Sequence, residues 1–60
     1  MATFEIYKRT DNQYSWRMKS ANGQVIASAG EGFVTKQSAQ NGIDAVKRDA
    51  STAKVVDKTL

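Results

Sequence analysis

The chain has 60 residues and a formal net charge of +3. It contains no cysteine and no histidine, which excludes disulfides, thiolate or imidazole metal sites, and catalysis by a thiol or an imidazole. A chain of this length buries only about 60% of the surface that it exposes when unfolded. We therefore expect one domain, residues 1–60, whose core is marginal in a single copy, so that a second copy is the obvious source of further burial.

The first half of the chain alternates hydrophobic and polar residues, which is typical of strands with one buried face. The alternation predicts three strands, over residues 3–8, 13–20 and 24–28. Asp11 and Asn12 predict a turn between the first two, because their side chains can bond the local backbone. Asn22 and Gly23 predict a two-residue type I′ hairpin between the second and third. The expected structure is an antiparallel three-stranded meander.

The second half predicts one helix, over residues 36–49. Its apolar residues recur every three or four positions, which lays one stripe along a helix: Ala39, Ile43, Val46 and Ala50. Thr35 is placed to cap the first turn. Gly42 costs a helix about 1 kcal/mol relative to alanine, so its presence inside this segment predicts that the helix approaches the sheet closely there.

A short fourth strand is predicted after the helix, over residues 54–58 around Val55 and Val56. The expected fold is α+β in the order β-β-β-α-β. We expect the helix to cover the sheet face that carries Phe4, Ile6, Tyr14, Trp16 and Met18. The last strand can pair with its own meander or with the sheet of a second copy. The marginal core favours the second option, a homodimer in which the C-terminal strands can be exchanged.

Much of the sequence resembles one known family, the YegP-like domains. The resemblance is carried by residues 4–8 (FEIYK) and 14–28 (YSWRMKSANGQVIAS), then by Gly30-Glu31-Gly32-Phe33, Lys36, Ser38-Ala39, Asn41-Gly42-Ile43 and Val46-Lys47. Met18 and Gln13 depart from the residues that are usual there. The resemblance covers nearly the whole chain and implies a β₃-α-β unit that occurs as tandem repeats or as a dimer of single units. It implies a small bacterial protein and supplies no activity.

A Gly-Glu-Gly sequence at residues 30–32 precedes the predicted helix, where phosphate-binding loops occur. A dinucleotide fingerprint would need glycine at position 35, and a P-loop would need Gly-Lys-Ser/Thr in place of Thr35-Lys36-Gln37. Free N–H groups at the helix start, together with Lys36, could still hold one anion. The favoured interpretation is a tight turn that needs glycine for its backbone angles.

Two basic residues, Arg17 and Lys19, share the polar face of the predicted sheet. Beside an exposed Tyr7 they could contact phosphates and help to stack a base, as sheet-based binders of single strands do. The favoured alternative is an ordinary solvated face, in which Glu5 neutralises Arg17 across the strands.

Catalysis has little support in the sequence. Glu31 is the only carboxylate in a loop of the kind that often carries active-site residues, and no two carboxylates are placed together by their spacing. We expect no enzyme activity, no cofactor and no bound metal.

The absence of a signal-like or membrane-spanning segment predicts a cytoplasmic protein. The leading hypothesis is a small non-enzymatic homodimeric module, for binding or structure. Weak nucleic-acid or anion binding through Arg17, Lys19 and Lys36 is the alternative.

Overall fold

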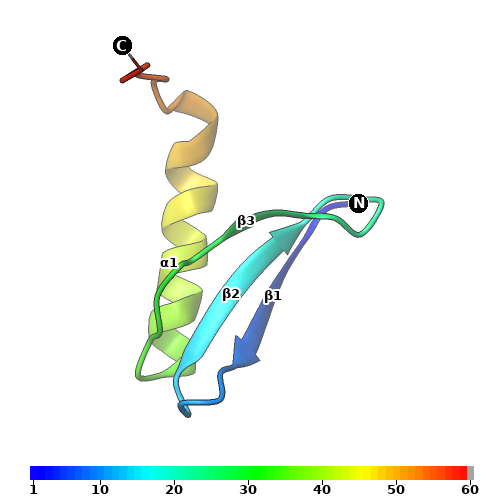
Figure 1. Cartoon of the computed structure of the whole chain (residues 1–60), viewed down its shortest axis with the longest axis vertical. Coiled ribbons are helices and arrows are strands. Elements are labelled where there is room, and N and C mark those ends of the chain that lie inside the picture. The colour runs from blue at the N-terminus through cyan, green and yellow to red at the C-terminus, as the bar shows by residue number, and fades with distance from the viewer. Residues whose placement is uncertain (60) are drawn as a thin grey trace.

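The computed structural model describes residues 1–59 and contains three strands followed by a helix (Figure 1). The elements are β1 (Thr3–Lys8), β2 (Tyr14–Lys19), β3 (Val25–Ser28), α1 (Lys36–Asp49) and a 3₁₀ turn, η1 (Ala50–Thr52). The strands form one antiparallel sheet in the order β1-β2-β3. The α+β class, the meander and the helix bounds are as predicted.

The core is built around one aromatic side chain, as the alternation in β2 predicts. Trp16 is only 6% exposed and packs against Ala39 and Ile43 of α1, which are also buried. Phe4 of β1 meets the indole edge-on, with ring centroids 5.7 Å apart and planes at 74°. The backbone of α1 lies close to β1 and β2 but not to β3, and β3 joins the core through Ala27.

Gly42 allows the close approach of helix and sheet that its position predicts. A Cβ atom at this residue would lie 3.0 Å from Nε1 of Trp16 and 3.4 Å from the ring of Phe33. The indole therefore occupies the space that a larger residue at position 42 would need. The N-terminal cap is also as predicted: the Ser38 N–H donates to Oγ1 of Thr35 at 3.1 Å.

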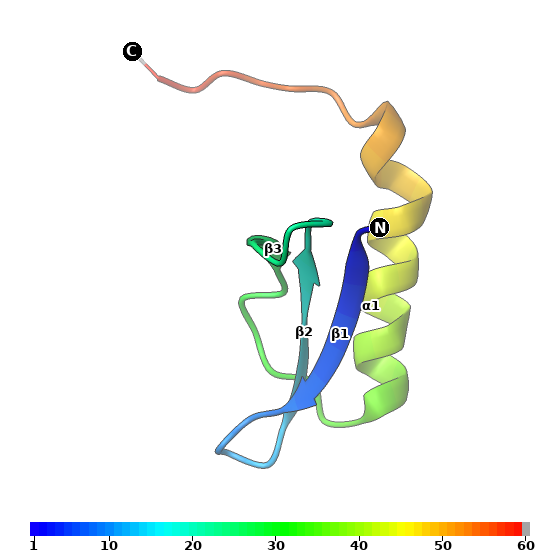
Figure 2. The same ribbon diagram turned by 90° about the vertical axis from the view of Figure 1, so that its right-hand side faces the viewer.

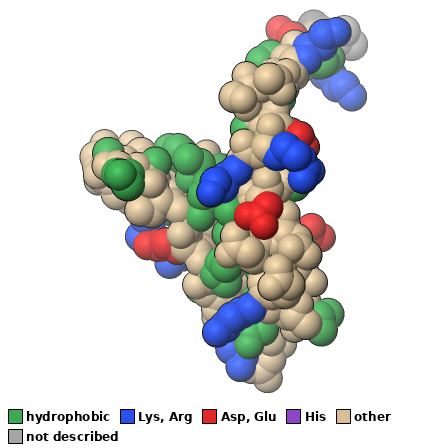
Figure 3. All heavy atoms as spheres, turned by 180° about the vertical axis from the view of Figure 1, so that it is seen from behind, with side chains coloured by type: hydrophobic (Ala, Val, Ile, Leu, Met, Phe, Trp, Pro, Cys, Tyr) green, Lys and Arg blue, Asp and Glu red, His purple; other side chains and the backbone are tan. Residues whose placement is uncertain are grey.

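Ile6 of the expected core and Ala50, the last residue of the predicted helical stripe, are exposed instead. Ile6 lies on the outer strand β1 and Ala50 lies in η1, beyond the end of α1. A helix with its side chains is only about 10–12 Å across, so one helix cannot cover a three-stranded sheet. Figures 1 and 3 show the helix diverging from the strands toward its C-terminal end, with hydrophobic side chains lining the open angle.

The hairpin between β2 and β3 differs from the predicted type I′ turn. The Ser20 N–H donates to the Gln24 carbonyl at 2.8 Å, and only Gly23 has a positive φ, of 89°. A type I′ turn would need positive φ at Asn22 as well. The loop is therefore a three-residue one that ends in a left-handed residue, and the prediction of a two-residue turn was wrong.

We expect Gly23→Ala to lower the free energy of unfolding by about 1–2 kcal/mol, the cost of a left-handed backbone at a residue with a Cβ. The added Cβ would meet nothing within 4 Å, so the cost comes from the backbone alone. Asn12 has φ of 68° in the corresponding turn between β1 and β2, and Asn12→Gly should change stability in the opposite direction. Urea denaturation measures both, and an unchanged Gly23→Ala stability would contradict the argument.

The predicted fourth strand, over residues 54–58, is not formed within the chain. Residues 53–59 leave η1 as an extended chain that passes above the end of the sheet without joining it (Figure 2). Val55 is 94% exposed and Val56 63% exposed. A strand exists only where a neighbour accepts and donates its backbone hydrogen bonds, and α1 carries this segment away from both edges of its own sheet. Pairing with the chain's own meander is therefore excluded in this structure.

Candidate functional site

The sheet face that α1 leaves bare carries the predicted basic residues. Glu5 of β1 is directly opposite Arg17 of β2 in the antiparallel register. Nε of Arg17 donates to Oε1 of Glu5 at 2.9 Å, and Nζ of Lys19 lies 3.5 Å from the same oxygen. One carboxylate therefore holds both cations, so the neutralisation of Arg17 by Glu5 is confirmed.

Tyr7 is half-buried rather than freely exposed. The guanidinium carbon of Arg17 lies 4.6 Å from the centroid of the Tyr7 ring, which is a cation–π contact. The Arg17 side chain itself keeps 40% of its surface exposed. The pair is therefore partly accessible to solvent, through the Arg17 side chain and the half-buried Tyr7.

The surroundings of Glu5 favour its ionised form. The hydrogen bond from Arg17 lowers the pKa of Glu5 below its ordinary value of 4.5. Desolvation partly opposes this effect, and the charge of Lys19 then lowers the pKa by a smaller amount. In the C-terminal segment, hydrogen bonds from the Thr59 hydroxyl and N–H lower the pKa of Asp57 in the same way. Both carboxylates are therefore charged at neutral pH.

The lowered pKa of Glu5 predicts a pH dependence of stability. Because the folded-state pKa lies below the unfolded one, the stabilisation is present above the unfolded pKa and is lost as the pH falls through the folded pKa. The free energy of unfolding should therefore decrease as the pH falls below about 4.5, and we expect Glu5→Gln to remove the part of this decrease that comes from Glu5. Urea denaturation at several pH values measures it. Asp44→Asn, which removes a carboxylate from the outer surface of α1, is the matched control. An Asp44→Asn effect equal to that of Glu5→Gln would contradict the assignment.

The Gly-Glu-Gly loop has the structure of a turn. Tyr14 and Phe33 exchange two backbone hydrogen bonds, of 2.7 and 2.8 Å, so the loop protrudes between β3 and α1. Gly30 has φ of 74°, which favours glycine. A Cβ at Gly32 would displace the end of the Gln13 side chain. The backbone of Gly30 therefore agrees with the favoured interpretation of this loop as a turn.

Lys36 does not join the other two predicted site residues. It is the exposed first residue of α1, whereas Arg17 and Lys19 lie on the sheet face opposite the one that α1 packs against. The three residues therefore do not form a single site. Anion binding at the helix N-terminus and binding at the bare face of the sheet are separate hypotheses.

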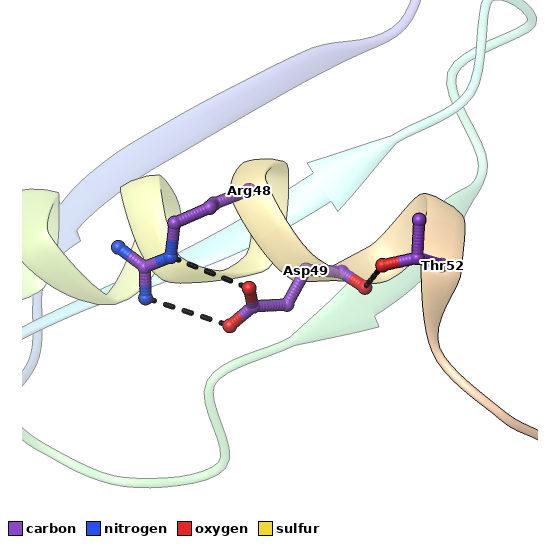
Figure 4. A network of polar contacts seen from close by, with 3 residues as sticks. All are labelled: Arg48, Asp49 and Thr52. Atoms are coloured by element: carbon purple, nitrogen blue, oxygen red, sulfur yellow. Dashed lines mark hydrogen bonds and ion pairs between the residues drawn. The ribbon is translucent and has the colours of Figure 1, made fainter.

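The C-terminal turn of α1 carries the basic residues Lys47 and Arg48, which suit the negative end of the helix dipole. Arg48 contacts the neighbouring Asp49 through Nε at 3.3 Å and Nη2 at 3.4 Å, and the Thr52 hydroxyl donates to the Asp49 carbonyl (Figure 4). The Arg48 and Asp49 side chains are largely exposed. This network lies at the end of the helix and contributes little to stability, because exposed ion pairs are weak.

β3 exposes two apolar side chains, which the sequence analysis did not predict. Val25 and Ile26 are 55% and 57% exposed, and the register between β2 and β3 shifts between Met18 and Lys19. The available signal was the uninterrupted apolar run Val25-Ile26-Ala27, which breaks the alternation expected of a strand with one wet face. β3 and the C-terminal segment therefore both expose valine or isoleucine.

Within residues 1–59, no group of three acidic, histidine or cysteine side chains is close enough to hold a metal ion, and no pocket is present. None of the helical segments in this range has the length and hydropathy needed to cross a membrane.

Comparisons with known proteins agree on one family. The model of a domain of unknown function, DUF1508, matches residues 10–57. A UPF0339 protein of Neisseria meningitidis is 42% identical over 52 residues, which are 87% of this chain and 91% of that protein. A UPF0339 protein of Stutzerimonas stutzeri is 42% identical over 48 residues, which are 80% of this chain but only 42% of that protein.

The fold is shared with a solved relative. The solution structure of a protein from Haloferax volcanii superposes with a TM-score of 0.87 at 41% identity, covering 93% of each chain. The names of these relatives assign no activity. On the sequence match and the shared fold together, the chain belongs to the DUF1508 family of UPF0339 proteins, the family that the YegP-like resemblance indicated.

Proposed function

We propose that this protein is a non-enzymatic homodimeric module for binding or structure, in which residues 53–59 of each copy add a strand to the sheet of the other. One observation carries the proposal: the C-terminal segment is extended and unpaired, while the sheet offers open strand edges. Val55 is almost fully exposed, so the segment would gain free energy if this side chain were buried. A second copy of the chain is the partner that offers a strand edge to bury it against.

The exposed surface supports this assembly. The structure exposes 4860 Å², whereas a folded monomer of this mass should expose about 3,900 Å². The excess, roughly 1,000 Å², is similar to the area of about 800 Å² that each partner buries in a stable interface. A dimer would bring the surface of each copy to the size expected of a compact protein.

Of the strands in the sheet, β3 is the best suited to pair with the C-terminal segment of a second copy. This strand is paired only with β2, and its exposed Val25 and Ile26 have no helix over them. Val55 and Val56 of a second copy are the same kind of side chain and suit a strand. Covering an open edge in this way also removes a site at which chains would otherwise aggregate.

The length of one relative points the same way. The 48 matched residues are 42% of the Stutzerimonas stutzeri protein, which is thus about 114 residues long and has room for two units of this size. Two units in one chain could complete each other in the way that we propose for two copies of this protein.

Sedimentation equilibrium of the full chain at micromolar concentration tests the proposal. We expect a folded species of twice 6.6 kDa that dissociates on dilution. A cooperatively folded species of 6.6 kDa throughout the concentration range would overturn it.

A further inference from the structure

The bare face of the sheet suggests a ligand that the dimer proposal does not require. We propose that this face binds single-stranded nucleic acid, with Arg17 and Lys19 contacting phosphates in place of Glu5 and with a base stacking on the Arg17–Tyr7 pair. The inference is independent of the strand exchange, because it uses the face of the sheet and not its edges.

The two cations have a spacing that suits a nucleotide chain. Arg17 and Lys19 are two residues apart on β2 and point to the same side, so their Cα atoms lie about 7 Å apart along the strand. An extended single strand can place successive phosphates against such a pair. The side chains of Arg17 and Lys19 are 40% and 32% exposed, so both can be reached by a ligand.

Glu5 holds these cations in position without preventing binding. It is shared by Arg17 at 2.9 Å and Lys19 at 3.5 Å, and its side chain is 40% exposed. An ion pair this exposed contributes little in water. A phosphate can therefore displace the carboxylate at low cost, and Glu5 acts as an internal competitor for the ligand.

The aromatic stack distinguishes a nucleic acid from an acidic peptide. The guanidinium carbon of Arg17 lies 4.6 Å from the centroid of the Tyr7 ring, which is the distance of a cation–π pair. Bases stack on such guanidinium planes as well as on aromatic rings. An acidic peptide would use the charges and leave the stack unused, so the pair favours a ligand that has both phosphates and flat bases.

Fluorescence anisotropy of a fluorescein-labelled oligouridylate at low ionic strength tests the proposal. We expect Arg17→Ala to weaken binding about tenfold, from one lost phosphate contact and one lost stacking surface. Lys19→Ala should reduce the slope of log K against log salt by about 0.7, the value for one phosphate contact to a single strand. Glu5→Gln should tighten binding, because the competing carboxylate is gone.

Lys47→Ala is the matched control, since it removes the same charge from the last turn of α1. It should leave the affinity close to that of the unmodified chain. Thermal unfolding followed by circular dichroism verifies that each variant is folded. If Arg17→Ala is unfolded, the salt slope of Lys19→Ala and the affinity of Glu5→Gln test the proposal in its place. The proposal would be overturned if no binding were seen at low salt, or if Glu5→Gln weakened binding. It would also be overturned if Lys19→Ala and Lys47→Ala lost affinity equally, or if polyglutamate bound more tightly than the oligouridylate.

Discussion

Replacing Trp16 with alanine is expected to leave the chain largely unfolded at 25 °C. Trp16 is 6% exposed and is the largest side chain of a core whose other buried hydrophobic members are Ala39 and Ile43. Truncating a buried tryptophan costs about 3–5 kcal/mol, whereas a 60-residue domain has a total stability of about 3–9 kcal/mol. Far-ultraviolet circular dichroism and urea denaturation measure the loss directly.

The indole N–H gives this prediction a sharp control. Nε1 of Trp16 is buried without a hydrogen-bond partner, so its polar group contributes a desolvation cost rather than a bond. Trp16→Phe keeps most of the apolar ring and removes that donor. We therefore expect a loss of only about 1–2 kcal/mol. If Trp16→Phe were as unfolded as Trp16→Ala, the packing of the ring would not be the source of stability.

Gly42 tests the same contact from the helix. In the unmodified chain, Gly42→Ala gains about 1 kcal/mol of helix propensity but places a Cβ 3.0 Å from Nε1 of Trp16. In the Trp16→Phe background that nitrogen is absent, so Gly42→Ala should stabilise the protein there more than in the unmodified chain. Equal effects in the two backgrounds would mean that residues 16 and 42 do not interact.

The features that sequence predicted well are those decided by neighbours along the chain. The bounds of α1 follow from the cap at Thr35 and the spacing of Ala39 and Ile43, which follow one another at intervals of four residues. The pairing of Glu5 with Arg17 follows from alternation in two adjacent strands. In each case, the local pattern and the final packing favour the same structure.

The predictions that failed depend on how segments pair and where they lie in space, which the local pattern does not determine. Asn22-Gly23 suits two kinds of hairpin, and the shift of register between Met18 and Lys19 accompanies the longer one. Residues 54–58 have a strand-like sequence, yet a strand also needs an edge that the chain does not bring to them. Ligand contacts at the sheet face and at Lys36 stay predictions.

Val56→Asp should dissociate the proposed dimer. The valine is 63% exposed in the single chain, so the substitution costs a monomer almost nothing. In an exchanged dimer it would place two carboxylates at apolar positions, one in each copy. Losing the burial of both valines costs about 3 kcal/mol or more, which is over a hundredfold in the dissociation constant. Sedimentation equilibrium at several concentrations measures that constant.

Two further substitutions separate an interface effect from a general effect of charge. Val34→Asp makes the same change at another exposed valine, outside β3 and the C-terminal segment, and should leave the dissociation constant unchanged. Ile26→Asp alters the receiving strand instead of the added one, so it should weaken the dimer as Val56→Asp does. Dissociation by Val34→Asp, or a dimer that tolerates both Val56→Asp and Ile26→Asp, would contradict pairing of the C-terminal segment with β3. In the second case the dimer would have to form through another surface, such as the open angle between α1 and the strands.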